Sequence, residues 1–355
     1  MKLAKIGKKY IGDNRKCYIT FEAGPTHFGY ESAKRLISYA SDAKADAIKF
    51  QFFNPDQLYA NKKLQISYKY LTKNFILKKK KANLYDLFKK RYLTKIEIKK
   101  LKKFADKKKI DFFLTIGDKS GLELISELNC KSVKIASADI NYIPFIRKVA
   151  KKNMNIQIDT GNSTLKEIYN AIKTIREQKN QNIIIHYCPS GYPAKNSGLN
   201  FKMINFLKKK FKYPIGYSDH FYGDIKSNLA IFSGANLIEK TISENIFSKS
   251  IEHSMSAEIK DAKKYVQDLR NTEKVLNFSN DKIKFLSKKE VEKRFTIRRS
   301  AYLNQDLKKG DILDLSKISF KRPGKGISPN AIFKYLKKKL KNNLKKNSLL
   351  LPKYF

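Results

Sequence analysis

The sequence predicts a (β/α)8 barrel, or TIM barrel, followed by a small C-terminal domain. Short apolar runs alternate with longer, lysine-rich segments of helical pattern from residue 17 to about residue 276, and each run ends in chargeable or hydroxyl side chains. After about residue 280, short strand-like pieces and tight turns take over. Strands that helices cover on both faces are continuously apolar, as these runs are. TIM-barrel active sites form at the carboxyl ends of the strands, which explains why each run ends in polar side chains.

The strands are predicted at eight runs of four to six residues, rich in Ile, Val, Phe or Tyr. They are Cys17–Glu22, Ala47–Gln51, Phe112–Thr115, Val133–Ser137, Ile156–Thr160, Ile183–Cys188, Pro214–Ser218 and Leu237–Lys240. Amphipathic helices are predicted between them at Ser32–Lys44, Thr94–Lys108, Asp118–Leu128, Leu165–Gln178 and Ala257–Leu276. This alternation is the pattern of parallel strands joined by helices.

Three segments are predicted along the chain: a barrel over 1–280, a charged linker over 281–296, and a small domain over 297–355. The last begins with the strand-like Ser300–Leu303 and continues through a turn at Lys309–Asp311. A domain of roughly 60 residues is marginally stable alone, so we expect it to dock on another surface.

The composition limits the class of protein. Hydrophobic residues make up 41% of the 355 residues, which excludes wholesale disorder. No apolar run approaches the roughly 18 residues of a membrane-spanning helix, and no apolar signal segment precedes Lys8. The cysteines Cys17, Cys130 and Cys188 are widely spaced, which predicts reduced thiols and a cytoplasmic location.

The net charge of +44 comes from 76 Lys and Arg against 32 Asp and Glu. These lysines recur along the whole chain instead of forming one basic tail or patch. We therefore interpret them as a compositional bias and do not predict dedicated nucleic-acid binding. Physically, the positive field favours small anionic substrates.

A set of motifs in chain order resembles the sialic acid (nonulosonate) synthase family. Phe21–Gly29 (FEAGPTHFG) is similar to the family's EAGxNHxG. The matching segments that follow are IKFQ at 48–51, VKIASAD at 133–139, DTG at 159–161, CPSGYP at 188–193, GYSDH at 216–220 and IEK at 238–240. The C-terminal RRSAY and KRPGKGISP segments resemble the antifreeze-like (SAF) domain that ends these enzymes. The resemblance covers nearly the whole chain.

The resemblance implies a phosphoenolpyruvate-dependent transferase. C3 of phosphoenolpyruvate attacks the open-chain aldehyde of an N-acetylated hexosamine, water adds at C2, and phosphate leaves. The acceptor would be N-acetylmannosamine or a diacetamido-trideoxyhexose, and the product a nine-carbon 2-keto acid of the sialic, legionaminic or pseudaminic type. The sequence leaves open which acetamido sugar is used.

The resemblance also assigns roles to residues at the strand ends. Cations and hydroxyls that converge from different strands can hold a phosphate and a carboxylate. The phosphoenolpyruvate ligands expected are Lys49, Thr115, Lys134, Ser137, Ser190 and Ser218. The catalytic carboxylates expected to move protons or orient water are Glu22 and Asp139. The sugar ligands expected are Gln51, Tyr192, Glu252 and Arg322, and the metal ligand is His220.

Structural roles are the alternative for several of these residues. Lys49 and Lys134 stand within apolar strands, where an ammonium group needs a partner, so buried Lys–Glu pairs could explain them. Glu22 could pair with Lys49. The serines could bond local backbone, and His220 could be a satisfied histidine without a ligand role.

The sequence departs from the family at four positions. Thr241 stands where the family has a second metal-binding histidine, so a divalent ion, Mn²⁺ or Mg²⁺, would be held weakly by His220. Thr26 replaces an asparagine, Asp139 replaces a glutamate, and Glu252-His253 replaces an Asp-His pair. These changes lie on the metal and sugar side, which predicts an altered acceptor sugar.

We therefore predict a cytoplasmic synthase that forms a domain-swapped homodimer, in which the small domain covers the partner's active site. Two alternatives from other classes stay open. A non-catalytic paralogue that has lost its metal would bind phosphoenolpyruvate without turnover. A barrel that binds RNA or another polyanion would show steeply salt-dependent binding.

Overall fold

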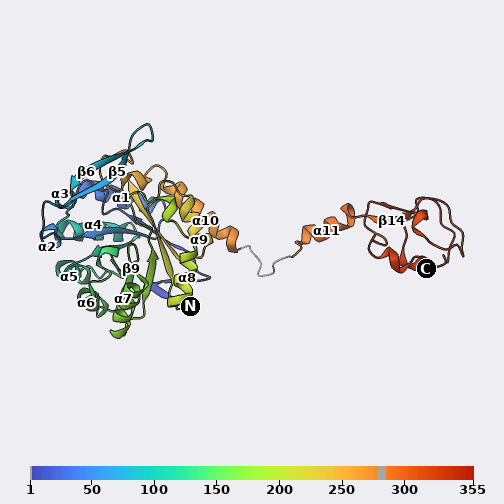
Figure 1. Ribbon diagram of the computed structural model, residues 1–355, viewed down its shortest axis with the longest axis horizontal. Coiled ribbons are helices and arrows are strands. Elements are labelled where there is room, and N and C mark those ends of the chain that lie inside the picture. The colour runs from blue at the N-terminus through green and yellow to red at the C-terminus, as the bar shows by residue number, and fades with distance from the viewer. Residues whose placement is uncertain (1, 278–284) are drawn as a thin grey trace. The chain divides into compact units, whose positions relative to one another are not determined.

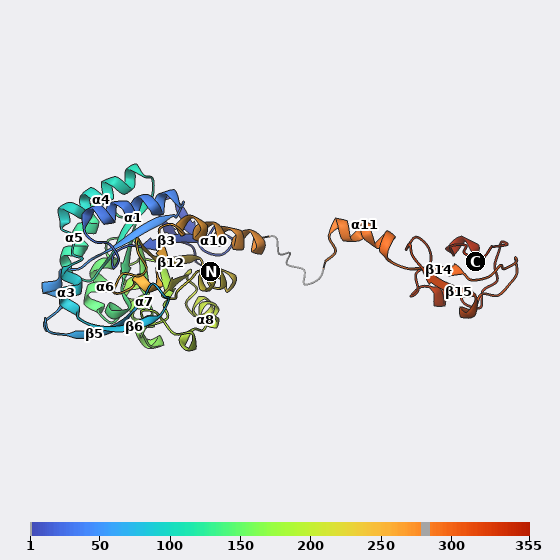
Figure 2. The same cartoon turned by 90° about the horizontal axis from the view of Figure 1, so that it is seen from above.

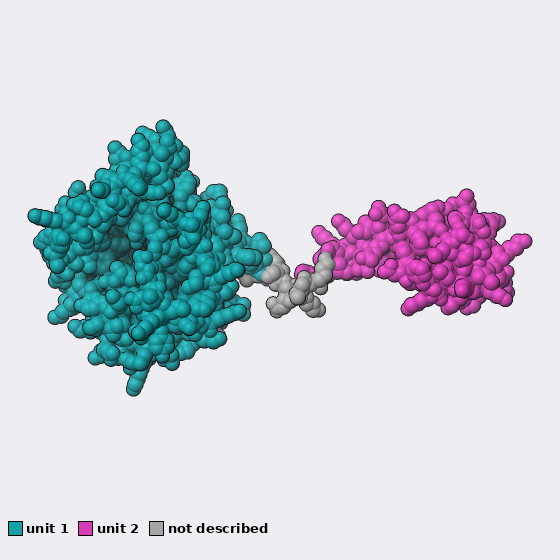
Figure 3. Space-filling view, in the orientation of Figure 1, with its two compact units in different colours: residues 1–278 teal, residues 279–355 magenta. Residues whose placement is uncertain are grey.

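The computed structural model describes residues 2–277 and 285–355. The chain divides into two compact units, residues 1–278 and residues 279–355, each of which is described by itself (Figure 3). Helix α11 (Lys288–Ile297) occupies most of the predicted linker and ends one residue beyond it, and Ser287 and Glu290 form the capping box that starts the helix. The exact domain boundaries stay a prediction.

The larger unit is a closed barrel of eight parallel strands, which confirms the predicted fold class (Figures 1 and 2). Neighbours pair in chain order from β3 to β12, and β12 closes the ring by pairing with β3, with Leu237 opposite Tyr18. The strands are β3 (Tyr18–Glu22), β4 (Ala47–Phe52), β7 (Asp111–Ile116), β8 (Ser132–Ile135), β9 (Asn155–Asp159), β10 (Ile183–Tyr187), β11 (Ile215–Asp219) and β12 (Leu237–Ser243). Every predicted apolar run overlaps one of these strands.

Helices cover the outside of the barrel and bury their apolar faces against it. They are α1 (Tyr30–Asp42), α4 (Lys95–Lys107), α5 (Lys119–Glu127), α6 (Ile143–Ala150), α7 (Leu165–Glu177), α8 (Lys202–Phe211), α9 (Ile225–Phe232) and α10 (Ala262–Asn277). Capping boxes at Thr94 and Thr164 start α4 and α7. Helices α6, α8 and α9 were not predicted from the sequence. Within the part of the chain that the structure describes, no helix has the length and apolarity that a membrane crossing requires.

A hairpin closes the amino-terminal end of the barrel. Its strands β1 (Ala4–Ile6) and β2 (Lys9–Ile11) pair antiparallel, and their side chains Ala4, Ile6 and Ile11 are buried. They pack in one cluster with Tyr18, Ala47, Phe113, Ile184 and Leu237 of the barrel strands. Because this end is sealed, the opposite end is the one where ligands can enter.

An excursion between β4 and α4 breaks the alternation of strands and helices. It contains α2 (Pro55–Leu58), the antiparallel strands β5 (Gln65–Leu71) and β6 (Leu77–Asn83), and α3 (Leu84–Lys89). Tyr68 of β5 is buried, and its hydroxyl donates a hydrogen bond to the carbonyl oxygen of Lys249 at 2.8 Å. This bond ties the hairpin to the segment that follows β12, which ends in the short strand β13 (Ala257–Glu258).

The smaller unit is built from short strands, turns and α11. Strands β14 (Ser300–Leu303) and β15 (Ile318–Lys321) pair antiparallel. Around them lie 3-10 turns at Leu315–Lys317, Ile332–Lys334 and Pro352–Tyr354. The core of this unit consists of Ala301, Leu303, Leu307, Leu313, Ile318, Ile327, Ile332, Leu340 and Leu350.

Candidate active site

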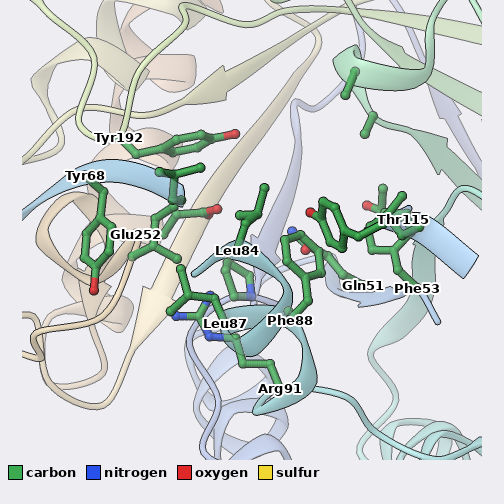
Figure 4. A pocket seen from close by; sticks show the side chains of 18 of the residues that line it. Gln51, Phe53, Tyr68, Leu84, Leu87, Phe88, Arg91, Thr115, Tyr192 and Glu252 are labelled. Carbon is green, nitrogen blue, oxygen red and sulfur yellow. The ribbon is translucent and has the colours of Figure 1, made fainter. Parts of the chain in front are cut away.

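Two adjoining cavities open at the carboxyl ends of the barrel strands. The inner cavity is small, about 70 Å³, and its walls are mostly charged and polar. The outer cavity, about 660 Å³, lies under the β5–β6 hairpin and α3 and has a largely apolar and aromatic wall (Figure 4). Both are lined by Gln51, Thr115, Ala136, Ser137, Tyr192 and Glu252, so the two cavities share one wall.

Lys134 on β8 is the most strongly paired cation of the inner cavity. Its ammonium lies 2.6 Å from a carboxylate oxygen of Glu239 and 2.8 Å from one of Asp159, and it donates to the hydroxyl of Ser218 at 3.1 Å. Burial opposes the charge, but the carboxylates of Asp159 and Glu239 hold the pKa of Lys134 above the usual range for lysine. Lys134 is therefore positively charged at every physiological pH.

Lys49 on β4 is held less firmly. It pairs with Glu22, donates to the hydroxyl of Thr115 at 2.8 Å, and lies 3.6 Å from Glu239. Burial lowers its pKa to about 8 against the pull of Glu239, and the neighbouring charge of Lys134 acts in the same direction as burial. The site thus combines one permanent cation with one that can lose its proton near neutral pH.

Glu22 stands at the end of β3 with one oxygen on Lys49 and the other facing the backbone. Its Oε1 accepts a hydrogen bond from the amide of Gly24 at 2.6 Å. A Cβ added at Gly24 would lie 2.6 Å from this oxygen and from the backbone nitrogen of Gln51, so only glycine fits at this position. The local chain therefore fixes the carboxylate of Glu22 in the cavity wall.

Below the inner cavity, a polar network supports the partners of Lys134. His186 Nε2 lies 2.8 Å from the amide oxygen of Gln157, and Nδ1 lies 3.0 Å from the Ser218 hydroxyl. Since an amide oxygen only accepts, Nε2 carries the proton. Burial lowers the pKa of His186 to about 4, so the ring stays neutral. The Ser218 oxygen also lies 3.0 Å from a carboxylate oxygen of Asp159, so its single proton is shared between that carboxylate and Nδ1 of His186.

His220 follows β11 and lines the inner cavity together with Thr241. Its Nδ1 lies 3.2 Å from the carbonyl oxygen of Pro189, which fixes the proton on Nδ1 and leaves a lone pair on Nε2. That tautomer suits a metal ligand, but nowhere in residues 2–277 and 285–355 do three or more His, Cys, Asp or Glu side chains form a group that could hold a metal ion. The described residues offer one nitrogen ligand here and do not complete a metal centre.

Two carboxyl groups of the outer cavity have raised pKa values. Burial, with the charge of Asp118 as a smaller cause, raises the pKa of Asp139 to about 6. Burial raises the pKa of Glu252 to about 7, although the nearby cations Arg91 and Lys49 oppose the shift. Near neutral pH, both groups exchange protons readily, as general acids and bases do.

Most of the predicted site residues meet at these cavities. The inner cavity is lined by Glu22, Lys49, Gln51, Thr115, Lys134, Ser137, Tyr192, His220 and Glu252. Ser218 contacts Lys134 from below, and Asp139 lines the outer cavity. Ser190 is exposed and lines neither cavity, so the structure does not bring it to the site. Arg322 belongs to the smaller unit, and its role stays a prediction.

Sequence reasoning missed two groups of residues. The pairing of Asp159 and Glu239 with Lys134 was not predicted, although both residues belong to predicted strands. The wall formed by the excursion was missed altogether. Its members Leu84, Leu87, Phe88 and Arg91 all line the outer cavity. Their spacing of three, four and seven residues is that of one helix face, which was the available signal.

Fold and site together define a TIM-barrel protein whose buried lysines and carboxyl groups meet at the carboxyl ends of the strands, where TIM-barrel enzymes carry their active sites. The chain belongs to the NeuB family: the family model matches residues 36–281, and a SAF domain model matches residues 298–355. This agrees with the resemblance that the motifs indicated.

Several relatives are similar over nearly their whole length. The N,N'-diacetyllegionaminic acid synthase of Campylobacter jejuni is 33% identical, over 95% of this chain and 99% of its own. The synthase of the same name from Legionella pneumophila is 31% identical, over 97% and 96%. The crystal structure of the N-acetylneuraminic acid synthetase of Leptospira borgpetersenii matches with a TM-score of 0.72 and 31% identity, covering 83% of this chain and 97% of that one.

Proposed function

We propose that this protein condenses phosphoenolpyruvate with an N-acetylated hexosamine to form a nine-carbon 2-keto sugar acid and phosphate. The observation that carries the proposal is the convergence of Lys49, Lys134 and Thr115 on a small polar cavity that opens into a much larger one. A compact dianion and a sugar need adjoining sites of these two kinds. Relatives named as legionaminic acid synthases support the same reaction type.

Phosphoenolpyruvate would bind in the inner cavity. Its phosphate and carboxylate need several cationic and hydroxyl donors, which Lys134, Lys49, Thr115 and Ser137 provide. Both ammonium groups are already paired with carboxylates. The incoming anion therefore has to share or displace these partners, and Lys134, with the most contacts, contributes most to its affinity.

The carboxyl groups divide the proton transfers between them. Glu22, fixed by Gly24 and Lys49, lies where it can orient the water that adds at C2. Asp139, with a pKa of about 6, can give a proton to the aldehyde oxygen as C3 attacks the carbonyl carbon. A divalent ion, Mn²⁺ or Mg²⁺, enters this proposal only as a weakly bound partner of His220, and no step is built on it.

The remaining parts of the proposal concern the whole chain. We expect the smaller unit to cover the active site of a second copy in a homodimer and to place Arg322 on the N-acyl group of the acceptor. All three cysteines are free and buried, as expected for the cytoplasm that we propose as the location.

The test is phosphate release from phosphoenolpyruvate across a panel of mono- and diacetamido hexoses, with and without added Mn²⁺. We expect release with at least one sugar of the panel. Phosphoenolpyruvate binding without turnover of any sugar would favour the non-catalytic paralogue, which the incomplete metal centre makes the second candidate. Salt-sensitive RNA binding without phosphoenolpyruvate binding would contradict the proposal entirely.

A binding measurement tests the assignment of Lys134. Lys134→Ala should weaken phosphoenolpyruvate binding by about 2–4 kcal/mol, because truncating one partner of a desolvated charge pair leaves the other uncompensated. Lys148→Ala, at an exposed position of α6, is the matched control and should bind normally. Calorimetric titration measures both variants. Unchanged affinity in a folded Lys134→Ala protein would show that Lys134 is a structural partner of Asp159 and Glu239.

A further inference from the structure

A guanidinium and a carboxyl group line the outer cavity without pairing with each other. Arg91 follows α3, and Glu252 lies in the loop after β12. Among the described residues, no ion pair joins them, and the guanidinium of Arg91 has a single hydrogen-bond partner, the hydroxyl of Ser250. The Glu252 carboxyl group receives no hydrogen bond from any described residue, although its backbone oxygen accepts one from the Ser256 hydroxyl.

Both residues are half-buried in this position. Burial lowers the pKa of Arg91, and the charge of Glu252 is the largest influence that opposes this shift. Burial likewise raises the pKa of Glu252, with Arg91 as the largest opposing influence. The two groups therefore sense each other electrostatically but remain apart. A partly buried carboxyl group without a hydrogen-bonded partner among the described residues, beside a guanidinium that has no carboxylate partner there, calls for an explanation such as a ligand between them.

A secondary amide has the chemistry to bridge the two groups. Its carbonyl oxygen can accept from the guanidinium of Arg91, and its N–H can donate to the carboxylate of Glu252. The alkyl end of an acyl group would then contact the apolar wall formed by Ile66, Leu84 and Leu87. A phosphate or carboxylate group would suit Arg91 but would be repelled by an ionised Glu252.

The position of the pair in the cavity restricts which part of the acceptor reaches it. Arg91 lines the outer cavity and not the inner one, where Lys49 and Lys134 lie. Figure 4 shows Glu252 and Tyr68 on one side of the outer cavity and Gln51, Phe53 and Thr115 on the opposite side. Glu252 lines both cavities, whereas Arg91 lines the outer one alone, so an amide that bridges the two groups lies on the outer side of Glu252, away from Lys49 and Lys134.

We propose that Arg91 and Glu252 form a subsite for an acylamino group remote from the aldehyde of the acceptor, which makes Arg91 a specificity-determining residue. This inference rests on the proposed function. It assigns the acceptor to hexoses that carry such a remote acylamino group, as a diacetamido hexose does, in addition to the one predicted to meet Arg322.

The test compares two sugars in two proteins. Arg91→Leu should raise the KM of a diacetamido hexose by about 10- to 150-fold, the loss expected for a hydrogen bond to a charged group. It should change the KM of the matching monoacetamido hexose, which lacks the remote group, by less than about threefold. Glu252→Gln, which keeps an acceptor oxygen, should cost less than Glu252→Leu. Arg147→Leu, at an exposed position of α6, is the control for removing a surface arginine.

Phosphoenolpyruvate affinity and melting temperature of each variant separate a local effect from misfolding. An equal loss with both sugars would overturn the subsite, as would a wild-type preference for a phosphorylated monoacetamido hexose that Arg91→Leu abolishes. If the wild type turns over no sugar, the proposed function fails, and binding decides the inference by itself. The inference is supported if the wild type binds the diacetamido hexose more tightly than the monoacetamido hexose and Arg91→Leu loses this difference. It is overturned if the wild type binds both sugars equally.

Discussion

Two lysines of the same cavity differ in how firmly they hold their protons. Lys134 contacts two carboxylates within 2.8 Å, whereas Lys49 shares Glu239 at 3.6 Å and otherwise depends on Glu22 and Thr115. Burial lowers the pKa of Lys49 to about 8, and the neighbouring charge of Lys134 acts in the same direction. The affinity of the site for an anion should therefore depend on pH through Lys49.

The sign of this dependence follows from the charge. Below about pH 8, Lys49 is an ammonium ion and attracts phosphoenolpyruvate; above it, the attraction is lost. We expect affinity to be level below about pH 7 and to fall by up to about tenfold per pH unit above pH 8. Calorimetric titration across this range measures it. Lys49→Arg keeps its charge and should lack the fall; an equal slope in both proteins would exclude Lys49 as its cause.

Thr241 is the residue at which this chain departs from its family's metal site. Because His220 is the one nitrogen ligand that the described residues bring to this cavity, the purified protein should carry little metal. Thr241→His should raise the affinity for Mn²⁺ by at least about 10–100-fold. This is the effect of residues that only hydrogen-bond to a metal ligand, so a direct ligand should contribute at least as much. Metal analysis and Mn²⁺ titration measure both values.

An imidazole added elsewhere is the control for that substitution. Ser190→His, at an exposed position outside both cavities, should leave Mn²⁺ affinity unchanged. A tightly bound, stoichiometric metal in the purified wild type would show that a ligand has been missed and that Thr241 is not the reason for weak binding.

At the scale of elements, burial decides what the sequence can predict. The eight barrel strands were predictable because both their faces are buried, so that every residue of a run such as Ile183–Cys188 has to be compatible with the core. Strand β6, by contrast, carries Lys78–Lys81 with every lysine exposed, and such a run has the composition of a solvated loop. Its strand conformation comes from pairing with β5, which no local pattern encodes.

Similar reasoning explains which site residues could be predicted from the sequence and which could not. Residues at strand ends were predictable because a barrel brings all its strand ends together, as Lys49, Thr115 and Lys134 show. Arg91 was not predictable as a site residue, because its position depends on how the β5–β6 hairpin and α3 fold over the barrel. Ser190 was predicted from its position after a strand, but the loop that follows β10 leaves it exposed.

The β5–β6 hairpin should affect the acceptor and not phosphoenolpyruvate. Tyr68→Phe removes the hydrogen bond to the Lys249 carbonyl that ties the hairpin to the segment carrying Glu252. We expect the KM of the acceptor to rise by about 2- to 10-fold, the scale of one hydrogen bond, with the affinity for phosphoenolpyruvate unchanged. Tyr39→Phe, at an exposed position on α1, is the matched control. Steady-state kinetics with each substrate varied in turn measure the effect, and equal changes for both substrates would contradict it.

At the scale of the whole molecule, buried charges are paired with opposite charges, and the excess positive charge lies on the surface. The chain has a net charge of +44, yet Glu22, Asp159, Asp219 and Glu239 are buried in the barrel, where they pair with Lys49, Lys134 and Lys240. Most other lysines are on the surface. The excess positive charge therefore surrounds the molecule and can attract an anion, while the binding cavity itself selects by geometry.

The smaller unit offers the last test, because a domain-swapped dimer builds each active site from two chains. Its helix α11 exposes Val291, Phe295 and Ile297, and its own core is small, both of which favour docking on another surface. If Arg322 acts on the partner's barrel, a heterodimer of Lys134→Ala and Arg322→Ala chains has one site with both defects and one with none. We expect each variant alone to be nearly inactive and purified heterodimers, isolated through two different tags, to regain about half the wild-type activity. If the small unit instead completes the active site of its own chain, every site in the heterodimer carries one defect. Phosphate release that stays at the level of the parent variants would then show that the domains are not exchanged.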